Sequence, residues 1–454
     1  MEAGREYVRE DGDDGGRSRR EFIAALGGVL GAAIVSDADA LAAAVGAGRG
    51  PQLPEGYAFH RIFTAGDGTP ELGDVAEVMQ GVMINDRSEV IFHAKLKSGA
   101  RAVYRLPISR DRRPRIERPR LIVAAGQEVA PGFVAERIGA GDTNNRGTYV
   151  TVIRGAKELN RVFMQRQGRP LRQLLAAGGR TPGKGDGRWS GSFGDIDIDA
   201  YDTITLSARY SLPGKVEHGL FLLPGGKRQS GRILMKSGDR IPNSRAAVTG
   251  FGLIERRGPF YVAQVYGRQG RHRRRQDFPL EPSGFLIGRV DAGRREQRLL
   301  AGAKLLGIQS SVIEGDAIVG PRVHRDGTAA TVVHRRDAQL QLHRRARGKR
   351  AEKIVESGDL GAVRGSKVRS VSAPLFGPDG LLLYRTIGKR SMRVIAATET
   401  ERRTILEVGD RVDGQRLQVI NLGWHTDQID SKGRIAFQAE LENGRTAIVI
   451  GTPI

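Results

Sequence analysis

A hairpin pattern that recurs along the chain constrains the fold of these 454 residues more than any other feature. The stretch Ile429 to Leu441 starts with an apolar residue, an Asp and a turn of small residues, and continues with alternating apolar and polar residues. The stretch Ile84 to Leu96 follows the same pattern. Alternation with a period of two is typical of a half-buried strand, and the turn residues before it indicate a β-hairpin.

Seven copies of the hairpin appear when the chain is aligned on the small residue of its turn, at a mean spacing of about 57 residues. These turn residues are Ser88, Gly147, Asp202, Gly258, Gly327, Gly380 and Gly433. The residues three positions earlier are Asn85, Asn144, Asp199, Glu255, His324, Gly377 and Asp430. Where this residue is Asn or Asp, we predict that its side chain accepts hydrogen bonds from the backbone N–H groups of its own turn.

A second marker repeats with the same period and supports the alignment. It is an apolar run that ends in glycine, at Gly66, Gly126, Gly178, Gly238, Gly302, Gly358 and Gly409. The fourth unit matches the pattern least well. Each unit therefore has room for four short strands, which we call A to D.

The first unit illustrates the four strands. Strand A is expected near Val78 to Ile84, B at Glu89 to Leu96, C at Ala102 to Leu106 and D at Arg120 to Ala125. Four strands at this period predict the blade of a β-propeller. The fold class is therefore all-β.

The two ends of the repeat region are complementary. Tyr57 to Pro70 reads as a D strand with no A, B or C before it, and Gly423 to Thr452 supplies A, B and C and stops where D should begin. A ring that pairs its first and last strands has no free sheet edge, whereas an open stack needs polar caps. We predict a seven-bladed propeller closed by the N-terminal strand; the alternatives are a β-solenoid or two smaller propellers.

The segment before the repeats carries an export pattern. Ser18, Arg19 and Arg20 come shortly before an uncharged run that starts at Phe22 and ends at Val35. This resembles a twin-arginine signal, and a small-residue cleavage site follows at 38–40. A membrane anchor is the alternative, but fourteen residues of helix cover about 21 Å of a hydrocarbon core of about 30 Å. We expect residues 1–40 to be a signal peptide, 41–56 a linker and 57–454 the propeller, with no transmembrane span in the mature chain, exported to the periplasm or the medium.

The hairpin also resembles a known repeat. An Asn-Asp-x-Gly-x-Val-x-Phe-x-Ala hairpin followed by a Gly-Asp-x-x-Pro-Gly turn is similar to the tandem repeats of exported bacterial proteins with a propeller-like fold and no settled activity. The matching positions include Asn85, Asp86, Val90, Phe92 and Ala94. The resemblance covers Tyr57 to Ile454, although Gly302 is followed by Ala and Gly409-Asp410 lacks the Pro. It implies fold and export and assigns no catalytic residue.

Charge is the main compositional clue to a partner. The chain has 73 basic and 51 acidic residues and no cysteine, which excludes disulfides and thiolate metal sites. Sixty of the basic residues are Arg. The surplus predicts attraction to polyanions, while GC-rich coding is an alternative source of so many arginines.

The basic residues cluster where strand C should lead to strand D. The clusters include Arg112, Arg113 and Arg115 in the first unit and Arg344, Arg345 and Arg347 in the fifth. C-to-D loops open on one face of a propeller, so these side chains are candidates for an anion-binding face. The tract 271–275 joins B to C and is expected on the opposite face.

One acidic run is the candidate metal site. Asp195, Asp197, Asp199 and Asp202 offer the carboxylates that Ca²⁺ prefers, although Ala200 and Leu206 depart from the EF-hand pattern. The alternative is a solvated face of an A strand that ends in an Asx turn, with Ile196 and Ile198 on the other side. Apart from this possible Ca²⁺ we expect no cofactor.

These observations lead to two functional hypotheses. The first is an exported, non-enzymatic propeller, monomeric, that presents a basic face to an anionic polymer or cell-envelope component. The second is a hydrolase or lyase that acts on a polyanionic glycan at the channel, with Asp197, Asp199 or Asp202 in the site. The chain has no Gly-x-Ser-x-Gly elbow or phosphate-binding loop, and none of its eight histidines shows zinc-motif spacing.

Overall fold

The computed structural model describes residues 52–454 with gaps, and the unit Pro51–Ile454 is compact. The gaps are 68–71, 73, 112, 157–159, 184–185, 227–230, 243–245, 269–283, 291–297, 304–313, 316, 335–339, 348, 360–366, 390 and 424–426. The expected signal residues Ser18, Arg19, Arg20 and Phe22 therefore lie outside the described residues, as do Arg112 and the tract 271–275.

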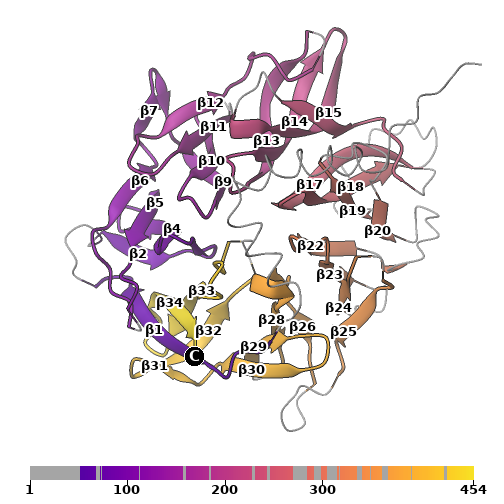
Figure 1. The fold of residues 1–454 in the computed structure, drawn as a ribbon. Helices are drawn as coiled ribbons and strands as arrows, with labels where there is room; N and C mark the ends of the chain where they lie inside the picture. Colours follow the sequence, from indigo (N-terminus) through magenta and orange to yellow (C-terminus); the bar gives the residue numbers. More distant parts are fainter. Residues whose placement is uncertain are drawn as a thin grey trace, which may run out of the picture. The chain divides into compact units, whose positions relative to one another are not determined.

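Seven antiparallel blades form a ring, which confirms the predicted seven-bladed β-propeller (Figure 1). Strand A of each blade borders the central channel and strand D lies outermost. Blade 1 contains β2 (Val75–Val78), β3 (Met83–Ile84), β4 (Glu89–Leu96), β5 (Arg101–Pro107) and β6 (Arg120–Ala124). Blade 2 contains β9 (Arg137–Thr143), β10 (Tyr149–Arg154), β11 (Asn160–Gln165) and β12 (Arg172–Leu175), preceded by the small hairpin β7 (Glu128–Ala130) and β8 (Phe133–Val134).

Blades 3 to 5 continue the ring. Blade 3 contains β13 (Arg188–Ile198), β14 (Ile204–Leu212), β15 (Lys215–Leu223) and β16 (Arg232–Lys236), with a 3₁₀ turn η3 at Pro224–Gly226. Blade 4 contains β17 (Ala247–Arg257), β18 (Phe260–Arg268), β19 (Gly284–Arg289), β20 (Arg298–Ala303) and β21 (Glu314–Gly315). Blade 5 contains β22 (Ala317–Val323), β23 (Ala329–His334), β24 (Leu340–Arg345) and β25 (Glu352–Glu356).

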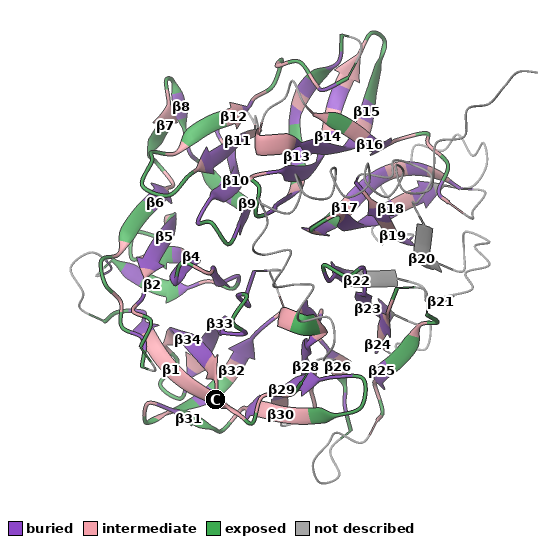
Figure 2. Ribbon diagram, in the orientation of Figure 1, coloured by how far each residue is buried: buried purple, intermediate pink, exposed green. Residues whose placement is uncertain are grey.

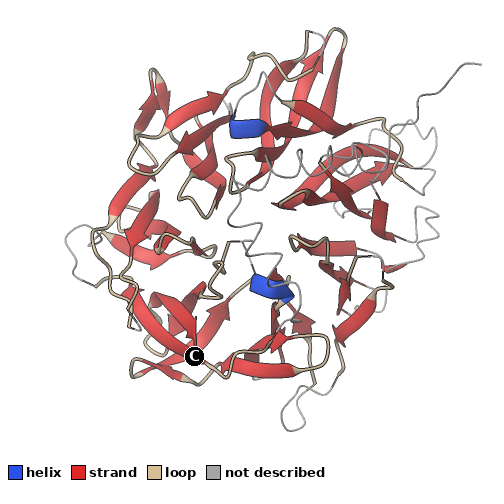
Figure 3. Ribbon diagram, in the orientation of Figure 1, coloured by secondary structure: helices blue, strands red, loops and turns tan. Residues whose placement is uncertain are grey.

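The last two blades complete it. Blade 6 contains β26 (Ser370–Val371), β27 (Leu375–Phe376), β28 (Leu382–Ile387), β29 (Met392–Ala397) and β30 (Arg402–Glu407), with a 3₁₀ turn η6 at Pro378–Gly380. Blade 7 contains β31 (Arg411–Val412), β32 (Gln415–Asn421), β33 (Ile435–Leu441), β34 (Thr446–Pro453) and β1 (Tyr57–Thr64). Figure 3 shows that strands dominate every blade.

The ring closes as predicted, through the two ends of the chain. β1 pairs with β34 in antiparallel register from Tyr57 opposite Pro453 to Thr64 opposite Ala447. The N-terminal strand is therefore strand D of the last blade. One boundary differs from expectation: strand A of this blade is β32, which ends at Asn421, and Ile429 adds only an isolated bridge to Ile435.

The A-to-B turns have the predicted local structure. All seven aligned turn residues have positive φ, including the non-glycine residues Ser88 (62°) and Asp202 (59°). The Asx side chains also behave as predicted: the Asn85 amide oxygen accepts hydrogen bonds from the N–H groups of Arg87 and Glu89, at 3.0 and 3.2 Å. Asn144, Asp199 and Asp430 make the same pair of bonds in their own turns.

The core consists of apolar clusters packed between neighbouring blades. One cluster joins Phe63 of β1 and Ile448 of β34 to Phe92 of β4, across the closing seam. Another joins Met164 of β11 to Trp189 and Phe221 of blade 3. Figure 2 shows burial concentrated on the inner strands and exposure on the outer strands β6, β12 and β25.

Blades 3 and 4 have the longest A strands. β13 and β17 are 11 residues each, and each contains two register irregularities against strand B. A β-bulge turns a strand and exposes a side chain or amide that regular pairing would hide. These two blades therefore differ locally from the rest of the ring.

Candidate functional site

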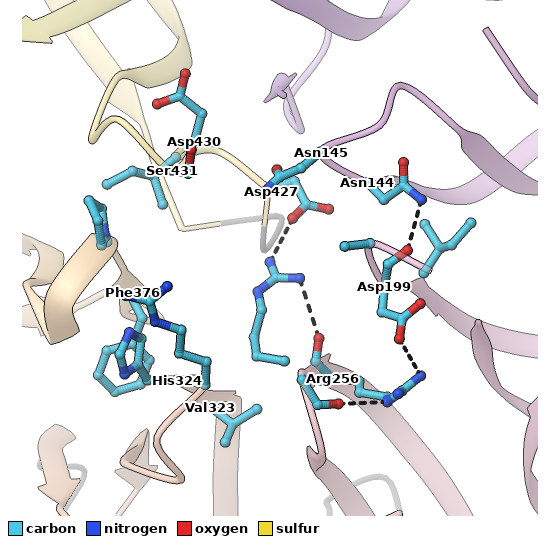
Figure 4. Close-up of a pocket in the computed structure, with 18 of the residues that line it drawn as sticks. Asn144, Asn145, Asp199, Arg256, Val323, His324, Phe376, Asp427, Asp430 and Ser431 are labelled. Atoms are coloured by element: carbon cyan, nitrogen blue, oxygen red, sulfur yellow. Dashed lines mark hydrogen bonds and ion pairs between the residues drawn. The ribbon is translucent and has the colours of Figure 1, made fainter. Parts of the chain in front are cut away.

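A pocket of about 400 Å³ lies where the A-to-B turns of blades 2 to 7 meet at the axis (Figure 4). Strand A is the innermost strand of each blade, so the turn that follows it lies close to the mouth of the channel. Asn145 and Ser431 are exposed at its edge, while His324 and Phe376 contribute rings 5.8 Å apart. We call this the mouth pocket.

Charges of both signs meet in the mouth pocket and pair with one another. Arg256 forms an ion pair of 2.8 Å with Asp199, and Arg257 one of 2.6 Å with Asp427 from blade 7. Arg325 and Asp379 form a more exposed pair of 3.3 Å. The pocket is therefore polar, and most of its charged side chains are paired with a side chain of opposite charge.

Many of the arginines at this end of the ring hold neighbouring blades together. Arg105 of β5, with a side chain only 5% exposed, donates to Glu89 of its own blade at 2.7 Å and to the carbonyl of Gly147 in the next blade at 2.8 Å. An arginine crosses each of the seven seams: Arg105, Arg166, Arg256, Arg322, Arg325, Arg385 and Arg434. Part of the arginine surplus therefore has a structural role. This role is a third explanation of the surplus, besides polyanion binding and coding bias.

Four buried carboxylates cluster beside the mouth pocket, and one of them, Asp427, lines it. Asp142, Asp197 and Glu255 come from the A strands of blades 2, 3 and 4, and Asp427 from blade 7. Neither oxygen of Asp197 accepts a hydrogen bond of normal geometry from a described residue, and the same holds for one oxygen each of the other three. Arg257 is the closest counter-charge.

The electrostatics of this cluster follow from burial. Burial raises the pKa of Asp197 well above its usual value, although Arg257 opposes the shift. Burial and the neighbouring Asp427 raise the pKa of Asp142 in the same direction. Burial likewise raises the pKa of Glu255. A second axial pocket of about 420 Å³, which includes Asp142 and Asp197 in its wall, lies farther from the A-to-B turns.

Three of the four aspartates of the candidate metal site have separate partners. Asp195 accepts the N–H of Ile254 at 2.7 Å, Asp199 caps its turn and Asp202 accepts from Arg166 at 3.0 Å. Within the part of the chain that the structure describes, no three His or carboxylate side chains are arranged to hold one metal ion. Calcium binding stays a prediction.

The alternative reading of that run is right in one respect and wrong in another. Ile196 and Ile198 enter the core, on the side opposite Asp197, as the alternation predicts. The face of Asp197 is not solvated, however, since this residue is only 1% exposed. Strand A borders a channel that side chains of the other blades fill, and the sequence of one strand does not reveal that.

The structure separates the basic candidates into two groups. Arg113, Arg115 and Arg347 are exposed, and the Arg113 side chain is 70% exposed beside Asp413 at 3.3 Å. Arg344, in contrast, lies within β24, 4% exposed, with its guanidinium paired to Glu352 at 2.5 Å. Arg345 is the last residue of β24 and donates to the carbonyl of Lys349 at 2.9 Å. Both residues were expected in the C-to-D loop. They lie in a strand instead, because strand C of this blade extends to Arg345.

Of the site residues predicted from the sequence that the structure describes, Asp199 alone lines the mouth pocket. Most residues of the pocket stand one to four places before the aligned turn residues, so the repeat alignment contained the necessary signal. Asn145 and Ala200 are two such residues, from neighbouring turns. The residues that follow them, Arg146 and Tyr201, contact each other, with the guanidinium 5.2 Å from the ring centroid. Closure of the ring brings these tips together, which no single repeat indicates.

Comparisons with known proteins add little to this picture. No protein-family model matches the chain, and no curated protein does. Similar solved structures include the BP39L lectin from Burkholderia pseudomallei, with a TM-score of 0.41, 11% identity, and coverage of 84% of this chain and 99% of the lectin. The SapL1 lectin in complex with alpha methyl fucoside has a TM-score of 0.35 and 11% identity and covers 73% of this chain and 96% of that one.

A third similar structure is an enzyme. The acylaminoacyl peptidase of Pyrococcus horikoshii has a TM-score of 0.39 and 11% identity, over 68% of this chain and 45% of the peptidase. Likenesses at this level carry no argument about what the present chain binds or does.

Proposed function

We propose that this chain is an exported, non-enzymatic binding propeller that presents the face of its A-to-B turns to an anionic polymer. The observation that supports it most is topological. In a four-stranded antiparallel blade the A-to-B and C-to-D connections lie at the same end. The exposed arginines of the C-to-D loops, Arg113, Arg115 and Arg347, therefore share the face with the mouth pocket.

A polymer suits this arrangement better than a small anion. The arginines that line the mouth pocket are already paired, as in Arg256 with Asp199, whereas the loop arginines farther from the axis keep exposed donors. An extended ligand reaches several loops at once and gains from each contact by counterion release. The mouth pocket then supplies polar contacts at the centre.

The experiment is a salt titration of heparin binding to the wild type and two charge-neutralised variants. The first carries Arg113→Gln, Arg115→Gln and Arg347→Gln, and we expect it to reduce the slope of log affinity against log salt by up to about 3. The matched control carries Lys97→Gln, Arg180→Gln and Lys389→Gln, three exposed positions at the opposite end of the blades, and should keep most of the slope. Equal slopes for the two variants, or no heparin binding near 150 mM salt, would overturn the proposal.

The glycan hydrolase or lyase is a second candidate, favoured by the buried carboxyls of the channel. A carboxylic acid with a raised pKa suits a general acid, and Asp197 has such a pKa and lines the second axial pocket. Asp199 and Asp202 are tied to turn and seam contacts instead. Release of reducing or unsaturated ends from hyaluronan, alginate or polygalacturonate, abolished by Asp197→Asn, would establish this candidate; no release would leave the binding protein.

The proposal of export rests on the N-terminal segment alone. Among the described residues no helix has the length and hydropathy needed to cross a membrane. Replacing Arg19 and Arg20 together by Lys should retain the precursor in the cytoplasm, because the twin-arginine receptor reads the arginine pair itself. Unchanged secretion of this variant in a fractionation experiment would contradict the proposal.

A further inference from the structure

A groove of about 650 Å³ opens between blades 3 and 4 and is separate from the mouth pocket. Its walls come from both blades and include Ser192, Ser207, His218, Phe251, Gln264 and Tyr266. His218 stands near the start of β15 and Tyr266 near the end of β18, so the groove lies toward the B-to-C turns. It thus faces away from the mouth pocket.

The bulges of β13 and β17 build the floor of this groove. Each bulge leaves a backbone N–H without a strand partner, and a polar side chain of strand B accepts it: Asp195 N–H donates to Ser207 Oγ and Leu253 N–H to Gln264 Oε1, both at 3.1 Å. Both acceptors are more than nine-tenths buried. The carboxylate of Asp195 joins the two blades through its 2.7 Å bond to the N–H of Ile254.

Glycines keep the groove open beside these polar groups. A Cβ added at Gly194 would lie 2.3 Å from Ser207 Oγ, and one at Gly252 would lie 2.7 Å from Gln264 Oε1. The two blades therefore use the same device, a bulge, a glycine and a buried acceptor, on the two sides of one seam.

The walls of the groove combine uncharged polar groups with apolar surface. Burial lowers the pKa of His218 to about 4, with a smaller contribution from Arg209, so its imidazole is neutral near pH 7. The imidazole contacts the Phe251 ring edge-on, with centroids 5.7 Å apart. Leu253 remains 40% exposed at the rim, and the Tyr266 hydroxyl would lie 3.3 Å from a Cβ at Gly252.

We propose that this groove is a second binding site, independent of the anionic polymer, which takes a neutral glycosyl unit. A sugar ring carries hydroxyl groups at its edge and apolar C–H groups on its faces, and the groove offers hydroxyl, amide and imidazole groups beside aromatic and leucine surface. Its volume falls within the range of small-molecule pockets, about 300 to 1,000 Å³. A polyanion would gain little electrostatic attraction in the groove, because the carboxylate of Asp195 at the floor opposes the positive charge of Arg209 in the wall.

The test is binding to an array of uncharged oligosaccharides with gluco-, manno-, galacto- and fuco-configured ends, followed by calorimetry on the best binder. We expect an affinity that changes by less than about twofold between about 50 and 500 mM NaCl, because no counterions are released. Ser192→Trp fills the exposed edge of the groove and should weaken binding by at least about tenfold. The matched control is Leu121→Trp, at a 50% exposed position of β6 in blade 1, which should leave the affinity unchanged.

A second variant guards against a folding defect of the first. Tyr266→Phe removes one hydroxyl from the wall and should weaken the same sugar by about 3- to 10-fold with an unaltered melting curve. Neutralising Arg113, Arg115 and Arg347 should alter heparin binding and leave the sugar affinity alone, so failure of one proposal is distinguishable from failure of the other. The inference would be overturned if no uncharged oligosaccharide on the array bound to the protein. It would also be overturned if the affinity for the bound oligosaccharide were unchanged in both groove variants.

Discussion

The mouth pocket and the groove between blades 3 and 4 show two ways in which one ring of blades makes a cavity. The mouth pocket forms because ring closure gathers six A-to-B turns at the axis, and its side chains are charged and paired across blades, as in Arg256 with Asp199. The groove forms because bulges distort two neighbouring A strands, and its polar groups are mostly uncharged.

The difference lies in what the polar groups already do. At the mouth, most arginines near the axis hold seams together, so that a ligand competes with the fold for them. In the groove, Ser207 and Gln264 satisfy bulge amides at the floor, while Ser192 and Tyr266 stand at the wall. Charge density in the sequence therefore does not show which arginines are already paired within the fold.

The largest expected effect breaks a seam at the mouth end. Arg105→Met leaves Glu89 buried without its cation and should lower the free energy of unfolding by about 3 to 5 kcal/mol, as is usual when one partner of a buried ion pair is removed. Urea denaturation measures it. The control, Arg113→Met, changes an exposed arginine and should cost less than about 0.5 kcal/mol. Equal losses for the two would mean that the seam arginines contribute no more than surface charges.

The next effect concerns the floor of the groove. Gly252→Ala places a methyl group against the Gln264 amide that holds the bulge, and overpacking of this kind costs about 1 to 3 kcal/mol. The control is Ser192→Ala at the exposed edge, which should be nearly neutral. A thermal melt of Gly252→Ala that matches the wild type would contradict the proposed role of this glycine.

A smaller effect, of opposite sign, is expected at Asp197, which lines the second axial pocket. Burial holds the pKa of Asp197 above its unfolded value, so the folded state binds this proton more tightly. Stability therefore falls as pH rises from about 4 through the raised folded pKa. Asp197→Asn should stabilise the protein by about 1 to 2 kcal/mol at pH 8, with the gain shrinking toward pH 4. Its control is Asp111→Asn, at an exposed position; a pH-independent difference for Asp197→Asn would contradict the assignment.

The smallest effect on stability separates two arginines of one loop region. Arg347→Gln should change the free energy of unfolding by less than about 0.5 kcal/mol but weaken heparin binding, because this side chain is exposed. Arg344→Gln should cost about 1 to 2 kcal/mol and leave the salt slope unaltered, because its guanidinium is buried against Glu352. Reversed behaviour in calorimetry and salt titration would show that the loop is paired differently in solution.

Much of the fold was readable from the sequence because it depends on local chemistry. The period of two, the Asx residues and the turn positions each act within about five residues, and all seven predicted turn residues have positive φ. Ring closure was also predictable, since the missing D strand of the last blade was present at the other end of the repeats.

Tertiary structure alone decided which charges face solvent and where the cavities lie. Arg434 bonds to Ser88, 346 residues away, and Arg257 to Asp427, 170 residues away. Such pairs arise only when seven blades close around one axis, because each blade places its turns against the next. The sequence by itself determined strands, turns and closure through short-range geometry, whereas burial and pairing of charges depend on neighbours that the ring brings together.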